Sequence, residues 1–147
     1  MVRESFTAYS VDPEVNQEEL EAAIKLLSVF GKVHRVEEKY MDAITALSGS
    51  APAYMAIVAD AMTYAGLEIG LDRDLALMIA AHAMISTGKL IIDGGKTPSQ
   101  ICAMVTTPGG VTIEGLFELE RFPVRHAFMR AVKAATDKAR RLALAFK

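Results

Sequence analysis

The chain has 147 residues, enough for one domain that buries a core without disulfides or metals. Sixteen basic and eighteen acidic residues give a net charge of −2, and no block of five like charges occurs, which argues against nucleic-acid binding. The single cysteine, Cys102, cannot form an internal disulfide and stands apart from the three histidines, so we expect no metal site. Together with an N-terminus that lacks a signal-peptide pattern, this favours a cytoplasmic protein.

Hydrophobic residues make up 52% of the chain, which is rich for a lone soluble domain. The longest apolar stretch, 75–92, is interrupted by His82 and by the polar run 86–89, whereas a membrane span needs an uninterrupted run. We therefore expect no membrane helix. The surplus of apolar residues indicates a buried interface.

The first 37 residues predict a β-α-β unit. A strand-like piece at 6–11 ends at Asp12 and Pro13, and Asn16 then begins a helix whose apolar positions recur with helical spacing up to Gly31. Alternation at 32–37 predicts a second strand. The unit resembles the tail end of an α/β domain, so we predict two parts, 1–37 and 38–147.

From Glu38 onward the pattern predicts helices alone. One helix, 41–47, is expected to break at Ser48, Gly49 and Ser50, and Pro52 then opens a second that runs to about residue 68. Further helices are expected at 73–92, after a cap at residue 72; from 98, after a cap at residue 97; at 111–120; and from 123 to near Phe146. The predicted fold class is all-α with a short β-α-β unit at the N-terminus.

The segment 105–113 is the strongest candidate for a binding site. Thr106, Thr107, Pro108 and the pair 109–110 predict a tight turn, and a helix starts immediately after it. Backbone N–H groups at a helix start stabilise an anion such as a carboxylate, and the hydroxyls of Thr107 and Thr112 add hydrogen-bonding groups. The alternative is that Thr106 or Thr107 only caps the helix and the glycines only turn the chain.

A second segment, 46–54, is also a turn of small residues that leads into a helix. It contains Ser48, Gly49, Ser50 and Pro52, and its small side chains would let a ligand approach the backbone. The alternative is an ordinary hinge with a serine cap.

These segments together resemble the C-terminal half of the pyrroline-5-carboxylate reductase family. The resemblance is carried by Asp42 to Ser50, Pro52 to Tyr54, Gly66, Gly70-Leu71, Lys89, the loop Thr107-Pro108-Gly109-Gly110, Ala134 to Thr136 and Arg140. It covers nearly the whole chain. Residues 1–37 look like the final strand, helix and strand of the family's dinucleotide domain.

The resemblance implies a helical domain of the 6-phosphogluconate dehydrogenase-like superfamily, interwoven with a second copy as a homodimer and often assembled into rings of dimers. It implies a pocket for pyrroline-5-carboxylate or proline, with Thr112 in a catalytic position near the ring nitrogen. The implied substrate-binding residues are Val105, Thr107, Gly109, Gly110, Val111 and Thr112. The implied cofactor-facing residues are Ser48, Gly49, Ser50 and Pro52.

The family uses NADP or NAD, but this chain has no glycine-rich turn after a strand. We therefore expect neither tight cofactor binding nor activity by this chain alone. Ala51 and Val111 depart from the family's pattern. Three interpretations stay open: the substrate-binding half of a reductase, an inactive dimerisation or regulatory module that pairs with a full-length reductase, and a half that works with a separate nucleotide-binding domain docked on 1–37.

Overall fold

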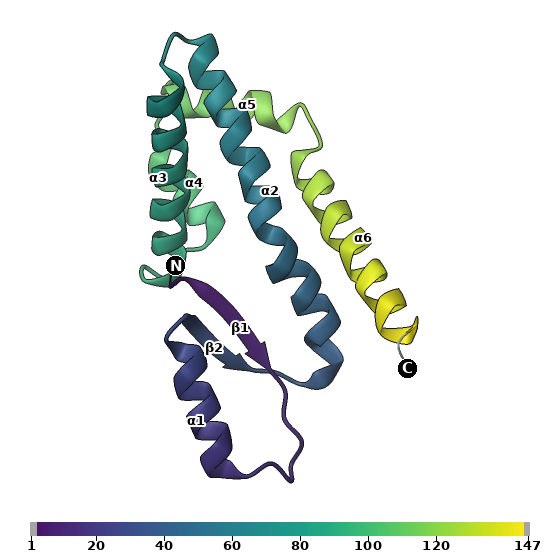
Figure 1. Ribbon diagram of the computed structural model, residues 1–147. Coiled ribbons are helices and arrows are strands. Elements are labelled where there is room, and N and C mark those ends of the chain that lie inside the picture. The colour runs from purple at the N-terminus through teal and green to yellow at the C-terminus, as the bar shows by residue number, and fades with distance from the viewer. Residues whose placement is uncertain (1–2, 146–147) are drawn as a thin grey trace. The chain divides into compact units, whose positions relative to one another are not determined.

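The computed structural model describes residues 3–145, and Phe146, the expected end of the last helix, lies outside them. Figure 1 shows the elements in chain order. They are β1 (Ser5–Tyr9), α1 (Gln17–Ser28), β2 (Gly31–Arg35), the 3-10 helix η1 (Glu38–Tyr40), α2 (Met41–Glu68), α3 (Arg73–Ile92), α4 (Pro98–Val105), α5 (Val111–Glu120) and α6 (Val124–Ala145). The predicted class, helical with a short β-α-β unit, is confirmed.

The described chain forms two compact units. One comprises residues 3–52 together with 130–145, and the other comprises 53–129. Helix α2 continues from the first unit into the second between Pro52 and Ala53. The predicted division after residue 37 falls inside the first unit and stays a prediction.

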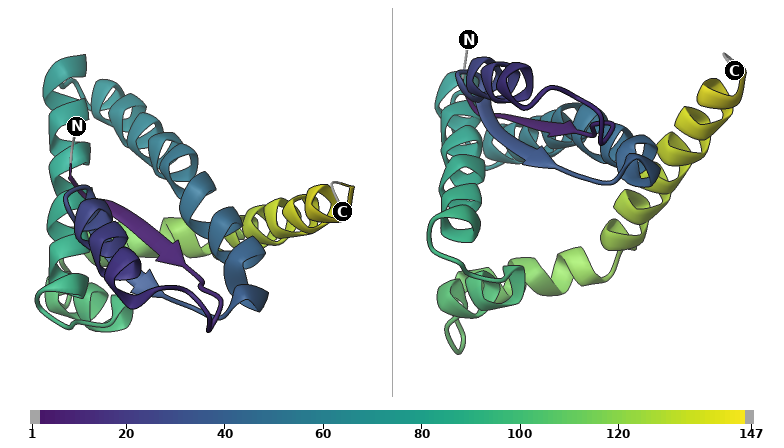
Figure 2. Two further views of the ribbon diagram at one scale, coloured as in Figure 1. Left: turned by 60° about the horizontal axis from the view of Figure 1, so that its bottom comes forward. Right: turned by 90° about the horizontal axis from the view of Figure 1, so that it is seen from below.

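The β-α-β unit at the N-terminus has the parallel pairing that its sequence pattern predicts. β1 and β2 run parallel, with Ser5 opposite Gly31 and Tyr9 opposite Arg35, and α1 lies along one face of the pair (Figures 1 and 2). Gly31 has a φ of +150°, and a β-carbon there would overlap the backbone of Ser5. Position 31, where the chain enters β2 after α1, therefore requires a glycine, because the backbone of β1 lies against it.

The helix starts follow the capping residues seen in the sequence. The Asn16 side chain accepts hydrogen bonds from the backbone N–H groups of Glu18 and Glu19 at 2.8 and 3.4 Å, and Asp72 accepts one from Leu75 at 2.9 Å. At the start of α4, Thr97 and Gln100 cap each other's backbone N–H groups, with Pro98 at the first helical position. The caps expected at residues 16, 72 and 97 are confirmed. The sequence pattern did not indicate the second hydrogen bond at the start of α4, in which the Gln100 side chain accepts from the Thr97 N–H.

The expected break at Ser48, Gly49 and Ser50 is wrong, because α2 runs unbroken from Met41 to Glu68 with Pro52 inside it. The Ser48 hydroxyl donates a hydrogen bond to the Ile44 carbonyl at 2.8 Å, one turn back along the helix, which is compatible with helical backbone. Pro52 lacks only the single N–H that would bond the Ser48 carbonyl. One missing bond does not end a helix whose neighbouring turns are rich in alanine.

Helices α2 and α3 meet closely at their connection. Gly70, with a φ of +92°, ends α2 in a Schellman arrangement: Leu71 N–H donates to the Gly66 carbonyl at 2.9 Å and Gly70 N–H to the Leu67 carbonyl at 3.0 Å. A β-carbon placed on Gly66 would lie 2.5 Å from the Ala76 β-carbon. Gly66 therefore lets the backbone of α2 approach α3.

The single chain buries small side chains and exposes large apolar ones. Its buried residues include Ala46, Ala59, Thr63, Ala76, Ala80 and Ile101, and no large side chain among residues 3–145 is fully buried. Exposed large apolar residues occur on every helix, among them Leu26, Ile57, Met78, Ile85, Met104, Phe117 and Met129. A soluble domain does not leave this much apolar surface in water, so the chain presents a surface suited to another polypeptide.

One helix in the described part of the chain, α3, is long and apolar enough to cross a membrane by length and composition alone. The core helix of a soluble protein meets the same criteria. In the single chain 11% of the apolar stretch of α3 is buried, and its buried residues are Ala76 and Ala80.

Candidate functional site

The turn between α4 and α5 has a defined backbone geometry. Gly110 N–H donates to the Thr107 carbonyl at 2.9 Å, Pro108 stands second in this four-residue turn, and Gly109 stands third with a φ of +69°. Proline at the second position and a positive φ at the third are the features of a type II turn. The expected tight turn is confirmed, and Gly109 adopts a conformation that other residues disfavour.

Thr106, just before this turn, and Thr107, its first residue, make different contacts. The Thr106 hydroxyl donates to the Cys102 carbonyl at 2.7 Å and so satisfies an acceptor near the end of α4. The Thr107 hydroxyl oxygen occupies the space that a β-carbon on Gly110 would need. Thr107 therefore presents its hydroxyl at the residue from which α5 begins.

Helix α5 starts without a side-chain cap. Asn16, Asp72 and Thr97 cap α1, α3 and α4, but Gly110 at the corresponding position of α5 offers no side-chain acceptor, and no side-chain cap is found there within residues 3–145. The first N–H groups of a helix need an acceptor from a side chain, water or a ligand. The alternative that Thr106 or Thr107 caps this helix is therefore wrong, and an anion is a suitable acceptor.

The residues predicted to contact substrate fall on one short segment of this unit. Val105 ends α4, Gly109 and Gly110 complete the turn, and Val111 opens α5 with 90% of its surface exposed. Thr112 follows on the first turn of α5 and is half-buried. The segment thus combines bare helix N–H groups, a threonine hydroxyl on each side and an apolar side chain open to contact.

The residues predicted to face the cofactor lie on α2 and belong to the other unit. Ser48 and Ser50 are half-buried, and Gly49 and Pro52 are exposed. A β-carbon on Gly49 would meet no atom within 4 Å, which leaves open space beside the helix. This surface can form a wall against a flat ring, but it has no glycine-rich turn or helix start to hold a phosphate. Because Ser48 to Ser50 are helical, the alternative of a hinge with a serine cap is wrong.

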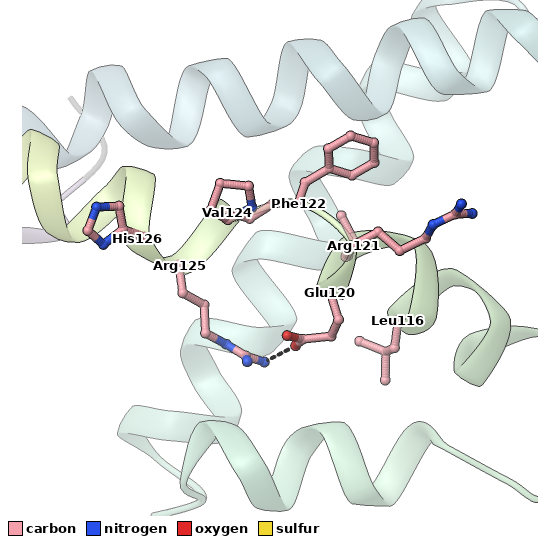
Figure 3. A pocket seen from close by; sticks show the side chains of 9 residues that line it. Leu116, Glu120, Arg121, Phe122, Val124, Arg125 and His126 are labelled. Carbon is pink, nitrogen blue, oxygen red and sulfur yellow. Dashed lines mark ion pairs between the residues drawn. The ribbon is translucent and has the colours of Figure 1, made fainter.

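A hollow of about 590 Å³ lies at the turn between α5 and α6, away from every predicted site residue (Figure 3). Its polar lining includes Glu120 and Arg125, which form an ion pair of 2.6 Å between the two helices. The remaining lining residues are Leu116, Leu119, Arg121, Phe122, Pro123, Val124 and His126. No sequence pattern indicates this hollow, since its residues come from an ordinary helix end. Within residues 3–145, no group of three histidine, cysteine or acidic side chains has a metal-binding arrangement.

These features define a helical domain built for contact with another polypeptide, with an uncapped helix start beside a glycine turn and a parallel β-α-β unit before it. Comparison with protein families identifies which domain of this class it is. Residues 38–142 match the family described as pyrroline-5-carboxylate reductase dimerisation, and the chain belongs to this family.

Curated relatives carry the same name. The chain is 43% identical over 143 residues to a pyrroline-5-carboxylate reductase of Thermus thermophilus, covering 97% of this chain and 54% of the relative. It is 38% identical to the enzyme of Glycine max, covering 96% of this chain and 52% of the relative. The chain thus spans about half the length of the curated relatives it matches and corresponds to their C-terminal portion.

Solved structures give the same result. A Plasmodium falciparum pyrroline carboxylate reductase with NADP bound superimposes with a TM-score of 0.86 at 28% identity, over 94% of this chain and 56% of that one. A Coxiella burnetii pyrroline-5-carboxylate reductase gives a TM-score of 0.88 at 27% identity, over 96% and 53%. The predicted resemblance, the fold and the family's self-association are confirmed.

Proposed function

We propose that this chain is the part of a pyrroline-5-carboxylate reductase that holds the imine substrate and joins two copies. The observation that carries the proposal is the uncapped start of α5 beside the Thr107–Gly110 turn, in a chain of this family. The substrate's carboxylate accepts hydrogen bonds from the N–H groups at the start of α5. The substrate contacts are Val105, Thr107, Gly109, Gly110, Val111 and Thr112.

Thr112 has the role of hydrogen-bonding at the ring nitrogen. In the proposed reaction, pyrroline-5-carboxylate becomes L-proline when a hydride reaches the C=N carbon and a proton reaches the ring nitrogen. A bound NADPH or NADH supplies the hydride. The Thr112 hydroxyl hydrogen-bonds and orients the ring nitrogen, whose basicity rises during the reaction. The turn holds the carboxylate. These two contacts together position the C=N carbon.

The nucleotide is held mainly by a part of the enzyme other than residues 38–145. Ser48, Gly49, Ser50 and Pro52 form a wall on the nicotinamide side, supported by the open space beside Gly49. The chain alone therefore binds NADP or NAD weakly and is inactive. Its partners are a second copy, in a homodimer or a ring of dimers, and the nucleotide-binding part of a reductase. We place it in the cytoplasm as a soluble protein, without nucleic-acid or membrane partners.

A substitution at Thr112 tests the proposed contact. Thr112→Val removes the hydroxyl at nearly constant volume and should weaken proline binding by about 0.5–1.5 kcal/mol, the net value of one hydrogen bond. Thr112→Ser keeps the hydroxyl and should retain most of the affinity. Equal affinity of wild type and Thr112→Val, measured by calorimetric titration, would reject the assignment. Absence of proline binding by any form would instead favour the alternative, an inactive module that pairs with a full-length reductase.

A further inference from the structure

Helix α4 ends without the kind of glycine that follows α2 and α3. Gly70 after α2 and Gly95 after α3 have φ values of +92° and +60°, which let the chain turn away while its backbone N–H groups bond the last carbonyls of the helix. After α4 the chain instead becomes extended at Thr106, with a φ of −102° and a ψ of 115°. The exit from α4 therefore needs another stabilising contact.

The Thr106 side chain supplies that contact. In a continued α-helix the N–H of residue 106 would bond the Cys102 carbonyl, four residues back. Here that N–H donates to the Ala103 carbonyl at 3.4 Å, and the Thr106 hydroxyl donates to the Cys102 carbonyl at 2.7 Å. The hydroxyl thus takes the place of the helical N–H at the residue where the backbone leaves the helix.

The position of this bond distinguishes it from other hydroxyl bonds of the same spacing. Ser48 and Thr63 also donate to the carbonyl four residues back, at 2.8 Å each, but both lie inside α2, whose backbone continues as a helix beyond them. Their hydroxyls bond within a conformation that the helix already holds. Thr106 is half-buried at the boundary, so its hydroxyl bond affects which conformation the chain adopts there.

We propose that Thr106 is a positioning residue for the Thr107–Gly110 turn. Its hydroxyl bond holds residue 106 extended and so sets the direction in which the turn leaves α4. Thr106 needs no contact with the substrate for this role, and it is not among the residues predicted to bind it. Its effect on substrate binding rests on the proposed function of the turn, whereas its effect on the backbone does not.

Without the hydroxyl, an extension of α4 by one residue becomes the competing conformation. The Cys102 carbonyl then lacks its partner, and the N–H of residue 106 satisfies it when that residue becomes helical. Pro108 disfavours helical backbone at Thr107, so the extension stops at residue 106. The ψ of this residue changes from 115° to about −42°, which rotates the peptide that leads into Thr107 and moves the whole turn.

Substitutions of Thr106 with and without a hydroxyl test this role through proline binding. Thr106→Val removes the hydroxyl but keeps a β-branched side chain of similar volume and helix propensity. Calorimetric titration should show proline affinity lowered by about three- to tenfold, the factor that corresponds to the net value of one hydrogen bond. Thr106→Ser keeps the donor and should retain the affinity of the wild type.

Thr97→Val, at the opposite end of the same helix, is the matched control. It is the same chemical change, and it also removes one hydrogen bond between a threonine hydroxyl and the backbone of α4, the bond of 3.3 Å from Gln100 N–H. This variant should unfold at a lower denaturant concentration but bind proline as the wild type does. Equal losses of affinity in Thr97→Val and Thr106→Val would overturn the proposal, because the stability of α4 would then be the cause.

NMR chemical shifts of residue 106 test the backbone of the whole chain without any ligand. The Cα and Cβ shifts, each compared with the random-coil value of its residue type, should indicate extended backbone in the wild type, Thr106→Ser and Thr97→Val. In Thr106→Val they should move to helical values, and unchanged shifts would overturn the proposal. Failure of the wild type to bind proline would reject the proposed function instead, and the shifts would still decide whether Thr106 positions the turn.

Discussion

The carbonyl oxygen of Thr107 accepts a hydrogen bond of 2.9 Å from Gly110 N–H, and the Thr107 hydroxyl fills the space beside the Gly110 α-carbon. These two contacts fix the turn from which α5 starts. They also determine which residues the loop accepts, because any side chain at position 110 meets the Thr107 hydroxyl. The loop is therefore organised before a ligand arrives, which lowers the entropy cost of binding.

Gly110→Ala should distort this loop without unfolding the helices around it. The new methyl group displaces the Thr107 hydroxyl, so we expect proline affinity to fall at least tenfold, about 1.4 kcal/mol. Circular dichroism should show unchanged helix content, and calorimetric titration measures the affinity.

Gly115→Ala is the matched control for this substitution. Gly115 lies within α5, and a β-carbon there would meet no atom within 4 Å. Alanine should stabilise the helix by roughly 0.5–1 kcal/mol and leave proline binding intact. If Gly110→Ala binds proline as well as Gly115→Ala does, the loop is not the binding site.

Because Gly66 lies against Ala76, alanine at position 66 should destabilise the chain, although alanine normally stabilises a helix relative to glycine. Gly66→Ala should destabilise the chain by about 1–3 kcal/mol in chemical denaturation, because its β-carbon meets that of Ala76 at 2.5 Å. Gly88→Ala, on α3 with open space around it, should be neutral or stabilising. Adding Ala76→Gly to Gly66→Ala should recover part of the loss, and a purely additive pair would contradict a direct contact.

The apolar surface of α3 should mediate self-association. Met78 and Ile85 lie two turns apart, each 54% exposed in the single chain. Ile85→Glu should weaken the dimer, because it places a charge in an apolar interface, while changing the stability of the single chain by less than about 0.5 kcal/mol. Sedimentation equilibrium measures the dissociation constant.

Ser86→Glu controls for the added charge. Ser86 is exposed on the neighbouring position of α3, and its replacement removes no apolar surface. If Ile85→Glu and Ser86→Glu weaken the dimer equally, the added charge and not the loss of apolar surface is the cause. A dimer unaffected by Ile85→Glu would place the interface elsewhere.

Local signals predicted most of this fold because they act within a few residues. Asn16, Asp72 and Thr97 mark helix starts by bonds to the next turn, and Gly31, Gly70 and Gly109 mark places where the backbone needs a positive φ. The break expected at Ser48 to Ser50 is wrong because serine, glycine and proline disfavour a helix only locally. The flanking turns of α2 together stabilise the helix by more than these residues destabilise it.

The candidate site was only partly accessible from sequence. The pattern of Thr107 to Gly110 predicts a turn, and its geometry agrees. The same pattern does not indicate that Thr106 bonds back to α4 or that α5 lacks a side-chain cap, because both depend on the path of the backbone. The hollow beside Glu120 and Arg125 had no signal, because its shape depends on how the chain turns between α5 and α6.

The most direct test of the central claim is the melting temperature of the purified chain with millimolar proline and, separately, with millimolar NADPH. A ligand that binds only the folded state increases the free energy of unfolding, by about 2.7 kcal/mol at a hundredfold excess over its dissociation constant, and so raises the melting temperature. We predict a rise with proline and little or none with NADPH. A rise with NADPH alone, or no rise with either, would contradict the assignment of this chain as the substrate-binding half.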